Sequence, residues 1–213
     1  MLDKSVEYRN IIMRMPVERV EKIAPPRLPE GFSIRTFQPG DEKNWVRIET
    51  AVLEFDRESD AMAYFTEHFL PHGDDLACRC LFICDDTGKA VATATAWYED
   101  SSLGHQAVLE WVSVDPGCQG KGLGTAVVSA ALALFPKCEP GLDVYLHTQT
   151  WSYKAVGLYH KLGFSMDKTG TIPRKGKNGE PMRLHLNEYA AALSVMRPVI
   201  PPALYDDLQK TAL

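Results

Sequence analysis

The chain has 213 residues, of which 45% are hydrophobic and 24% are charged, with a formal net charge of -5 at pH 7. This length suits one large domain, or one domain with terminal additions, and the hydrophobic content suffices for a buried core. The acidic balance disfavours a nucleic-acid-binding protein, which usually shows a basic face.

No segment resembles a secretory signal, and no apolar run is long enough to cross a bilayer, so we expect a cytoplasmic protein without a membrane partner. The five cysteines are an odd number and form no disulfide framework. On a strand, Cys78, Cys80 and Cys84 would face one side. No cysteine or histidine pair has zinc spacing, so we expect buried thiols and no metal.

In chain order, a strand is expected at 8–15, ended by Pro16, and a proline-stiffened connector follows at 23–29. Residues 32–37 alternate apolar and polar, the pattern of a half-buried strand. Two helices are expected next, the first carrying Trp45, Ile48 and Val52 at helical spacing.

The middle of the chain predicts a hairpin of strands 79–84 and 90–97, followed by a third strand at 108–114. A helix at about 122–135 is expected to end at Pro136, a strand follows at 144–148, and a helix at 152–162 ends at Gly163. A short strand begins at Phe164, and the tail contains possible helices at 187–196 and 203–209. This order predicts an α+β fold whose sheet is antiparallel at its centre, with one parallel crossing and helices flanking it.

Residues 119–124 form a loop with alternating glycines, Gln-Gly-Lys-Gly-Leu-Gly, between an apolar strand and an apolar helix. Such glycines let the backbone approach a ligand, and the helix adds its positive dipole end, so the junction predicts an anion or pyrophosphate site. A P-loop is disfavoured because Thr125 is displaced from the position after the lysine. A dinucleotide fingerprint is disfavoured because the glycine spacing and the mid-chain position differ.

This loop resembles the Gln/Arg-x-x-Gly-x-Gly/Ala motif of the GNAT family of N-acetyltransferases. The family's second motif, an Asn followed by Ala, Leu-Tyr and Gly-Phe, is similar to Ser152 through Phe164, with Ala155, Leu158-Tyr159 and Gly163-Phe164 in register and Ser152 in place of Asn. Two motifs in the expected order are more specific than a glycine pattern alone. The resemblance covers residues 31–166 and implies a GNAT fold, with a mixed, mostly antiparallel sheet flanked by helices.

The resemblance also implies that acetyl-CoA is the co-substrate. The strand before the loop would bind pantetheine through its backbone, and the loop amides would hold the CoA pyrophosphate, as the dipole argument also suggests. Lys121 would add charge there or simply be solvated, and Ser152 would contact pantetheine or cap its helix. The cofactor-binding residues implied are Val112, Ser113, Val114, Gln119, Gly120, Lys121, Gly122, Leu123, Gly124, Thr125, Ser152, Ala155 and Tyr159.

The catalytic residues that the resemblance implies are Tyr159 and Glu110. Tyr159 matches the tyrosine that protonates the departing thiolate, and its alternative role is that of a core tyrosine. Glu110 would act as general base, directly or through water, or else would only form an ion pair or attract a cationic acceptor. On an unbroken strand, Glu110 would share the face of Val112 and Val114. Glu54, Asp56 and Glu58 would favour an amine or form a solvated turn.

The function expected is acetyl transfer from acetyl-CoA to a primary amine of a small molecule or peptide, by direct attack. The alternative is a non-catalytic acyl-CoA-binding or sensing module on the same fold. The expected organisation is an N-terminal strand and connector at 1–30, the acetyltransferase domain at 31–170 and a C-terminal extension at 171–213 packed on that domain. We expect a monomer or homodimer.

Overall fold

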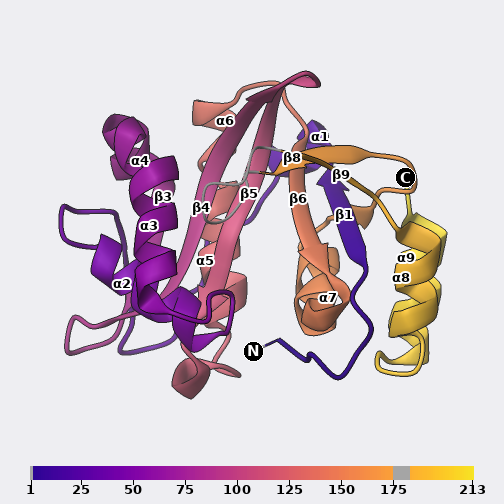
Figure 1. Cartoon of the computed structure of the whole chain (residues 1–213), viewed down its shortest axis with the longest axis horizontal. Coiled ribbons are helices and arrows are strands. Elements are labelled where there is room, and N and C mark those ends of the chain that lie inside the picture. The colour runs from indigo at the N-terminus through magenta and orange to yellow at the C-terminus, as the bar shows by residue number, and fades with distance from the viewer. Residues whose placement is uncertain (1, 175–182) are drawn as a thin grey trace.

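The computed structural model describes residues 2–174 and 183–213, which contain a seven-stranded sheet in the order β2-β3-β4-β5-β6-β1-β7 and a two-stranded sheet of β8 and β9 (Figure 1). The strands are β1 (Asn10–Met15), β2 (Ser33–Thr36), β3 (Cys80–Cys84), β4 (Ala90–Ser101), β5 (Gly104–Val114), β6 (Val144–Gln149), β7 (Ser165–Met166), β8 (Thr171–Arg174) and β9 (Arg183–Leu186). The helices are α1 (Val17–Val20), α2 (Glu42–Ala51), α3 (Glu58–His68), α4 (Gly73–Arg79), α5 (Leu123–Leu132), α6 (Phe135–Cys138), α7 (Tyr153–Lys161), α8 (Tyr189–Met196) and α9 (Pro202–Thr211).

In the large sheet all neighbouring strands are antiparallel except β5 and β6, which run parallel. Parallel neighbours need a crossover connection, and here α5 lies between them in the chain. The expected α+β fold, with a mixed, mostly antiparallel sheet flanked by helices, is therefore confirmed.

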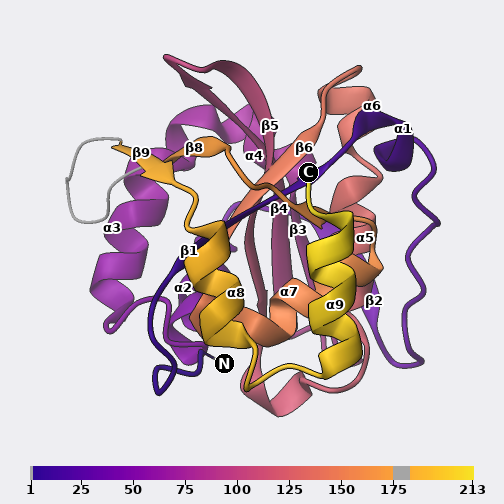
Figure 2. The same cartoon turned by 90° about the vertical axis from the view of Figure 1, so that its right-hand side faces the viewer.

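The N-terminal strand β1 lies inside the sheet, between β6 and β7 (Figure 2). Asn10 pairs with Gln149 and Met15 with Val144 along β6, while Met13 and Arg14 pair with β7. Its central residues are buried on both faces, as expected for an interior strand. The boundary near residue 30 stays a prediction.

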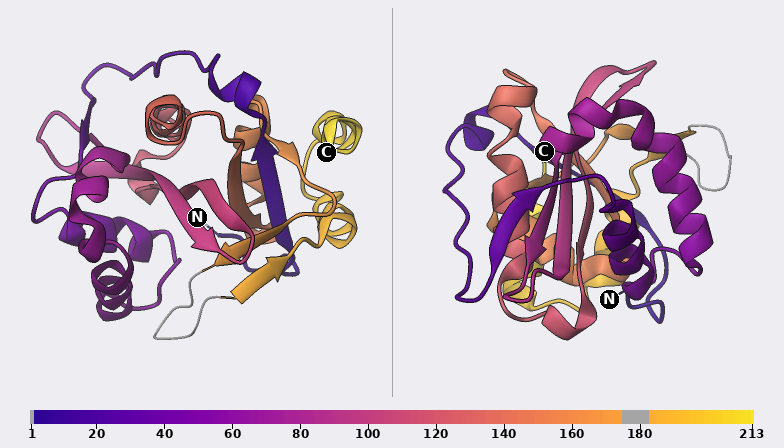
Figure 3. Two further views of the ribbon diagram at one scale, coloured as in Figure 1. Left: turned by 90° about the horizontal axis from the view of Figure 1, so that it is seen from above. Right: turned by 90° about the vertical axis from the view of Figure 1, so that its left-hand side faces the viewer.

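The sheet separates two hydrophobic cores, and α2–α4 and α5 cover opposite faces of it (Figure 3). One core packs α5, α7, α8 and α9 against the sheet, and the small side chains of Ala92, Ala94 and Ala96 let α5 lie close to β4. The other core packs aromatic residues of α2 and α3 against the opposite face, around the fully buried Trp45. Both cores position the elements of the site described below.

The structure differs from the sequence predictions in the end of one helix, in an additional helix and in the orientation of three cysteines. Helix α5 ends at Leu132, and Pro136 lies in the first turn of the separate helix α6, where a proline is tolerated because it needs no hydrogen-bond acceptor. Helix α4 was not predicted. Cys78 lies on that helix and is exposed, whereas Cys80 and Cys84 are buried on β3, so the three thiols do not share one face.

The C-terminal helices α8 and α9 belong to the core that contains α5, through Ala192, Leu193, Met196 and Leu208. They lie close to the expected helical segments 187–196 and 203–209. Residues 175–182, within the expected extension 171–213, lie outside the described residues. Among the described helices, none has both the length and the apolar character needed to cross a bilayer.

Candidate active site

Strands β5 and β6 pair over a short distance and then separate. Their parallel register joins Ala107 to Val144 and Val108 to Tyr145, and no later residue of either strand has a partner on the other among the described residues. Beyond this point β5 continues to Val114 and β6 to Gln149. The divergence opens the sheet between two buried strands, and the cavities described below lie there.

The outer part of β5 contains a β-bulge at Trp111. Thr95 pairs with Glu110 and Thr93 with Ser113, so Trp111 and Val112 together face the single residue Ala94. Trp111 has a φ of 52°, the left-handed conformation that bulky residues rarely adopt. A strained residue of this kind is frequently found at a functional site.

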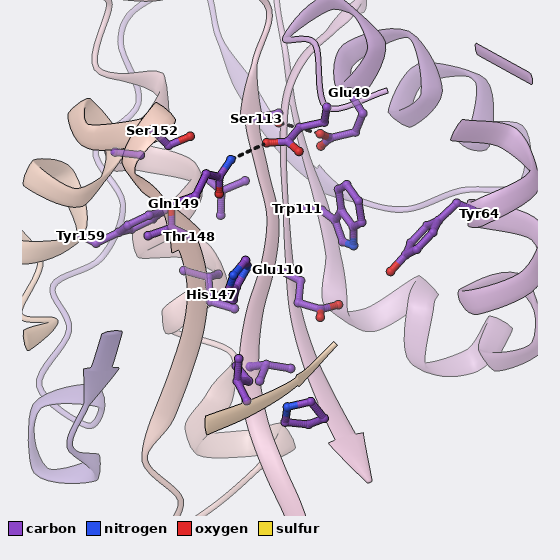
Figure 4. Close-up of a pocket in the computed structure, with 17 residues that line it drawn as sticks. Glu49, Tyr64, Glu110, Trp111, Ser113, His147, Thr148, Gln149, Ser152 and Tyr159 are labelled. Atoms are coloured by element: carbon purple, nitrogen blue, oxygen red, sulfur yellow. Dashed lines mark hydrogen bonds between the residues drawn. The ribbon is translucent and has the colours of Figure 1, made fainter. Parts of the chain in front are cut away.

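The bulge corrects the expected orientation of Glu110. The extra residue shifts the alternation of side chains, so Glu110 shares its face with Ser113 and not with Val112 and Val114. Val112 and Val114 pack towards the core that contains α5, while Trp111 packs towards the aromatic core. Figure 4 shows Glu110, Trp111 and Tyr64 around one side of the site. The expectation of an unbroken strand was wrong at this point.

The loop after β5 leads into α5 through a left-handed turn. The Asp115 side chain accepts a hydrogen bond from the Gly117 amide at 3.1 Å and is anchored by Arg47 of α2 at 2.9 Å. Gly122, at the N-cap of α5, has a φ of 81°. The amides of Leu123, Gly124 and Thr125, in the first helical turn, donate to no acceptor among the described residues. Such free amides and the helix dipole form a site that favours an anion.

Gly124 allows α5 to approach α7 and β5 closely. A Cβ at this position would lie 3.1 Å from Leu158 Cδ1 and 3.7 Å from Val114 Cγ2. Gly124, the third glycine of the motif, therefore allows close packing of α5, whereas Gly122 allows the left-handed turn.

A cleft of about 420 Å³, here called the loop cleft, lies between the glycine loop, the end of β5 and α7. It is lined by every predicted cofactor-binding residue except Lys121, whose Nζ lies 5.8 Å from the centre of the Phe32 ring. The predicted residues at the loop cleft are Val112, Ser113, Val114, Gln119, Gly120, Gly122, Leu123, Gly124, Thr125, Ser152, Ala155 and Tyr159.

Tyr159 packs in the hydrophobic core and also lines the loop cleft. Its side chain is only 7% exposed, and its ring packs edge-on against Phe164 at 6.0 Å. Its hydroxyl makes no hydrogen bond to any residue that the structure describes. Burial raises the pKa of Tyr159, and the nearby negative charges of Glu54 and Glu49 raise it further, so the phenol is protonated at neutral pH.

Ser152 occupies the N-cap position of α7, but its side chain makes no capping hydrogen bond. The capping role is therefore not what the structure shows. Ser152 instead lines the loop cleft and a second cavity beside it. Its role as a pantetheine contact stays a prediction.

This second cavity, here called the strand cavity, has a volume of about 120 Å³ and lies between β5, β6, α2 and α3 (Figure 4). Glu110, Trp111, Tyr64, Gln149 and Tyr159 are among the residues that line it. The loop cleft and the strand cavity thus meet at Tyr159.

Glu49 of α2 is a residue of this site that the sequence reasoning missed. It is fully buried, and its Oε2 accepts a hydrogen bond from Ser113 Oγ at 2.9 Å. It lies one position after Ile48, on the same buried side of the helix as Trp45 and Val52. A glutamate within the apolar stripe of a predicted helix is a signal that could have identified it.

A third cavity of about 250 Å³, here called the entrance cavity, adjoins the strand cavity. Glu54 and Gln149 line both, and Gln149 Nε2 donates to Glu54 Oε1 at 3.5 Å. The N-terminal segment reaches this place, because Asp3 N donates to Trp151 O at 2.9 Å and Trp151 Nε1 to Val6 O at 2.7 Å. Of the three acidic residues considered from sequence, Glu54 and Asp56 line this cavity and Glu58 does not.

In the described part of the chain, no group of three or more His, Cys, Asp or Glu side chains is arranged to hold a metal ion. The five cysteines are free. The loop cleft and the strand cavity together contain several carboxylates, the buried phenols of Tyr64 and Tyr159, the imidazole of His147 and the thiol of Cys118.

Residues 43–164 match a sequence model described as the acetyltransferase (GNAT) family. The chain is similar to mycothiol acetyltransferase from Actinosynnema mirum, with 32% identity over 158 residues, 72% of this chain and 50% of that protein. For the protein of the same name from Renibacterium salmoninarum, the identity is 27% over 163 residues, 72% of this chain and 46% of that protein. The chain therefore spans about half the length of the curated relatives it matches.

Solved structures give the same fold. A GCN5-related N-acetyltransferase from Sphaerobacter thermophilus superposes with a TM-score of 0.58 at 20% identity, over 74% of this chain and 48% of that one. A GNAT-family acetyltransferase from Colwellia psychrerythraea gives a TM-score of 0.54 at 16% identity, over 75% of this chain and 53% of that one. At these identities the likeness concerns the fold alone.

Proposed function

Because the chain belongs to the GNAT family of acetyltransferases, we propose that it transfers an acetyl group from acetyl-CoA to a primary amine by direct attack. One observation carries the proposal: the loop cleft joins the free amides at the start of α5 to the hydroxyl of Tyr159, between two diverging strands. This geometry provides an anion site at one end and a proton donor at the other.

The residues of the loop cleft fit a CoA donor. The free amides of Leu123, Gly124 and Thr125 suit a pyrophosphate, and the left-handed turn at Gly122 leaves the space at its Cα open. When bound, acetyl-CoA would supply an activated acetyl thioester. Val112 lies in the bulge, beyond the point where β5 and β6 separate, and lines the loop cleft, so its amide is proposed to donate to the acetyl carbonyl.

Tyr159 is proposed to donate a hydrogen bond, and then its proton, to the departing sulfur. Its raised pKa keeps the phenol protonated until negative charge develops beside it. Glu110, half-buried in the strand cavity, is proposed to take the proton from the amine, directly or through a water molecule. Buried Glu49 would hold Ser113, and with it the end of β5, in position.

The proposal is tested by measuring thiol release from acetyl-CoA with a panel of primary amines. Tyr159→Phe is expected to lower turnover by about a hundredfold while the affinity for CoA changes by less than about threefold. Tyr205→Phe on α9 is the matched control and should behave as the wild type. Unchanged turnover in Tyr159→Phe would remove this tyrosine as the acid.

The non-catalytic alternative makes the opposite prediction. A CoA-binding or sensing module would bind CoA in the loop cleft and release no thiol with any amine in the panel. The names of the relatives are a reason to include a mycothiol-related amine in that panel. We expect the protein to act in the cytoplasm, as a monomer or homodimer, and its free cysteines support a reducing compartment.

A further inference from the structure

The acceptor side of the site is acidic in two connected cavities. Glu49, Glu54 and Glu110 line the strand cavity, and none of the described residues around it is a lysine or arginine. Its walls also contain the rings of Tyr64 and Trp111, whose centres lie 4.9 Å apart. Carboxylates beside aromatic faces attract an organic cation through charge and through cation–π contact.

The entrance cavity continues this acidic surface outwards. Glu54, Asp56 and Asp60 line it together with one cation, Lys4, whose Nζ lies 5.5 Å from the centre of the Trp151 ring. Asp60 is already neutralised by two hydrogen bonds of 2.9 Å from Arg57. For Asp56, which is exposed, the described residues give no ion pair within 4.0 Å. Negative charge thus remains at the outer end of the passage.

Tyr159 provides an independent sign that this passage receives a ligand. Its side chain is more than nine-tenths buried, it lines the strand cavity, and its hydroxyl has no hydrogen-bond partner among the described residues. The hydroxyl oxygen is not among the described side-chain atoms that are fully buried without a partner, so it is open to the cavity, where a polar ligand group can reach it.

We propose that the acceptor is a linear aliphatic diamine or polyamine. One nitrogen lies in the strand cavity beside Glu110 and Tyr159, and a second, which stays protonated, lies in the entrance cavity beside Glu54 and Asp56. This assignment rests on the proposed function for the fate of the first nitrogen. That nitrogen gives a proton to a carboxylate and attacks the acetyl carbon, so that a carbon–nitrogen bond forms as the carbon–sulfur bond breaks. The departing sulfur takes the proton of Tyr159, and the second proton that the nitrogen loses restores the phenol.

The experiment measures binding without any acetyl donor, by calorimetry with putrescine and with n-butylamine, which has the same chain and one amine fewer. One partly exposed ion pair contributes up to about fivefold in affinity, so two carboxylates around the second ammonium predict a preference for putrescine of about tenfold. Asp56→Asn should remove about half of that preference on a logarithmic scale, and Asp56→Asn combined with Glu54→Gln should remove nearly all of it. Glu58→Gln, an exposed neighbour that lines none of these cavities, is the matched control and should leave it unchanged.

Equal affinity for the two probes would overturn the proposal, and so would a preference that survives the double substitution. Thiol release separates this inference from the proposed function. If putrescine binds with the expected preference but releases no thiol, the inference stands and the acetyl transfer fails. If n-butylamine is acetylated as efficiently as putrescine, the acetyl transfer stands and the inference fails.

Discussion

Replacing Gly122 with alanine is expected to lower the free energy of unfolding by about 1–2 kcal/mol, the usual penalty for a left-handed residue with a Cβ. The structure isolates this effect. Gly122 has a φ of 81°, and a Cβ built there meets nothing within 4 Å, so the substitution strains the backbone without creating a clash.

Gly117→Ala is the matched control in the same loop. Gly117 is not among the glycines of positive φ, and its Cβ would meet only Asp115 Oδ1, at an ordinary 3.6 Å. Alanine at a compatible position reduces the entropy of the unfolded chain and stabilises by about 0.4–1 kcal/mol. The two variants should therefore differ by about 2 kcal/mol, which is about 4–8 °C in Tm for a chain of this size.

The assay is urea unfolding of both variants, followed by calorimetric titration with CoA. Gly122→Ala should also weaken CoA binding by about tenfold, the value of one hydrogen bond to a charged group, because the turn at Gly122 directs the first amides of α5. If both variants unfold at the same urea concentration, the backbone argument is refuted. If Gly122→Ala is less stable but binds CoA as the wild type does, the start of α5 is not the anion site.

Three further outcomes are expected. Lys121→Ala should change CoA affinity by less than about threefold, by calorimetry, because Lys121 lies over Phe32 and outside the loop cleft. When protonated, His105 donates hydrogen bonds from its two ring nitrogens to the carboxylates of Glu139 and Asp100, which raise its pKa above 6.5. The stabilisation by protonated His105 should therefore be complete below pH 6.5 and disappear as the pH rises through the raised pKa. In urea unfolding, the difference in unfolding free energy between the wild type and His105→Gln should shrink with rising pH. Trp45→Ala should cost about 3–5 kcal/mol in urea unfolding, whereas Leu103→Ala, at a side chain that is 42% exposed, should cost less than about 0.5 kcal/mol.

The features predicted correctly from sequence are those that neighbouring residues decide. The end of the strand, the glycine loop and the helix around residues 112–125, and the helix that carries Tyr159, follow from local periodicity and from the positions of the glycines. Because these two segments are each continuous, the residues placed at the loop cleft by motif register lie there in the structure, with Lys121 as the exception.

The features that were missed depend on pairing between distant segments. The bulge at Trp111 exists because two residues of β5, between Glu110 and Ser113, lie opposite one residue of β4, between Thr93 and Thr95, and no pattern within β5 shows this. Glu49 reaches the site because α2 packs on the aromatic core, and the N-terminal segment reaches it because Trp151 Nε1 donates to the carbonyl of Val6.

The sequence by itself thus determined the proposed donor half of the site, because a glycine loop before a helix N-terminus presents free amides that favour an anion. Only the tertiary structure decided the proposed acceptor half. The orientation of Glu110, the hydrogen bond between Ser113 and Glu49, and the passage past Glu54 each require elements that lie far apart in the chain. Their positions follow from sheet register and core packing, which are set by the whole molecule at once.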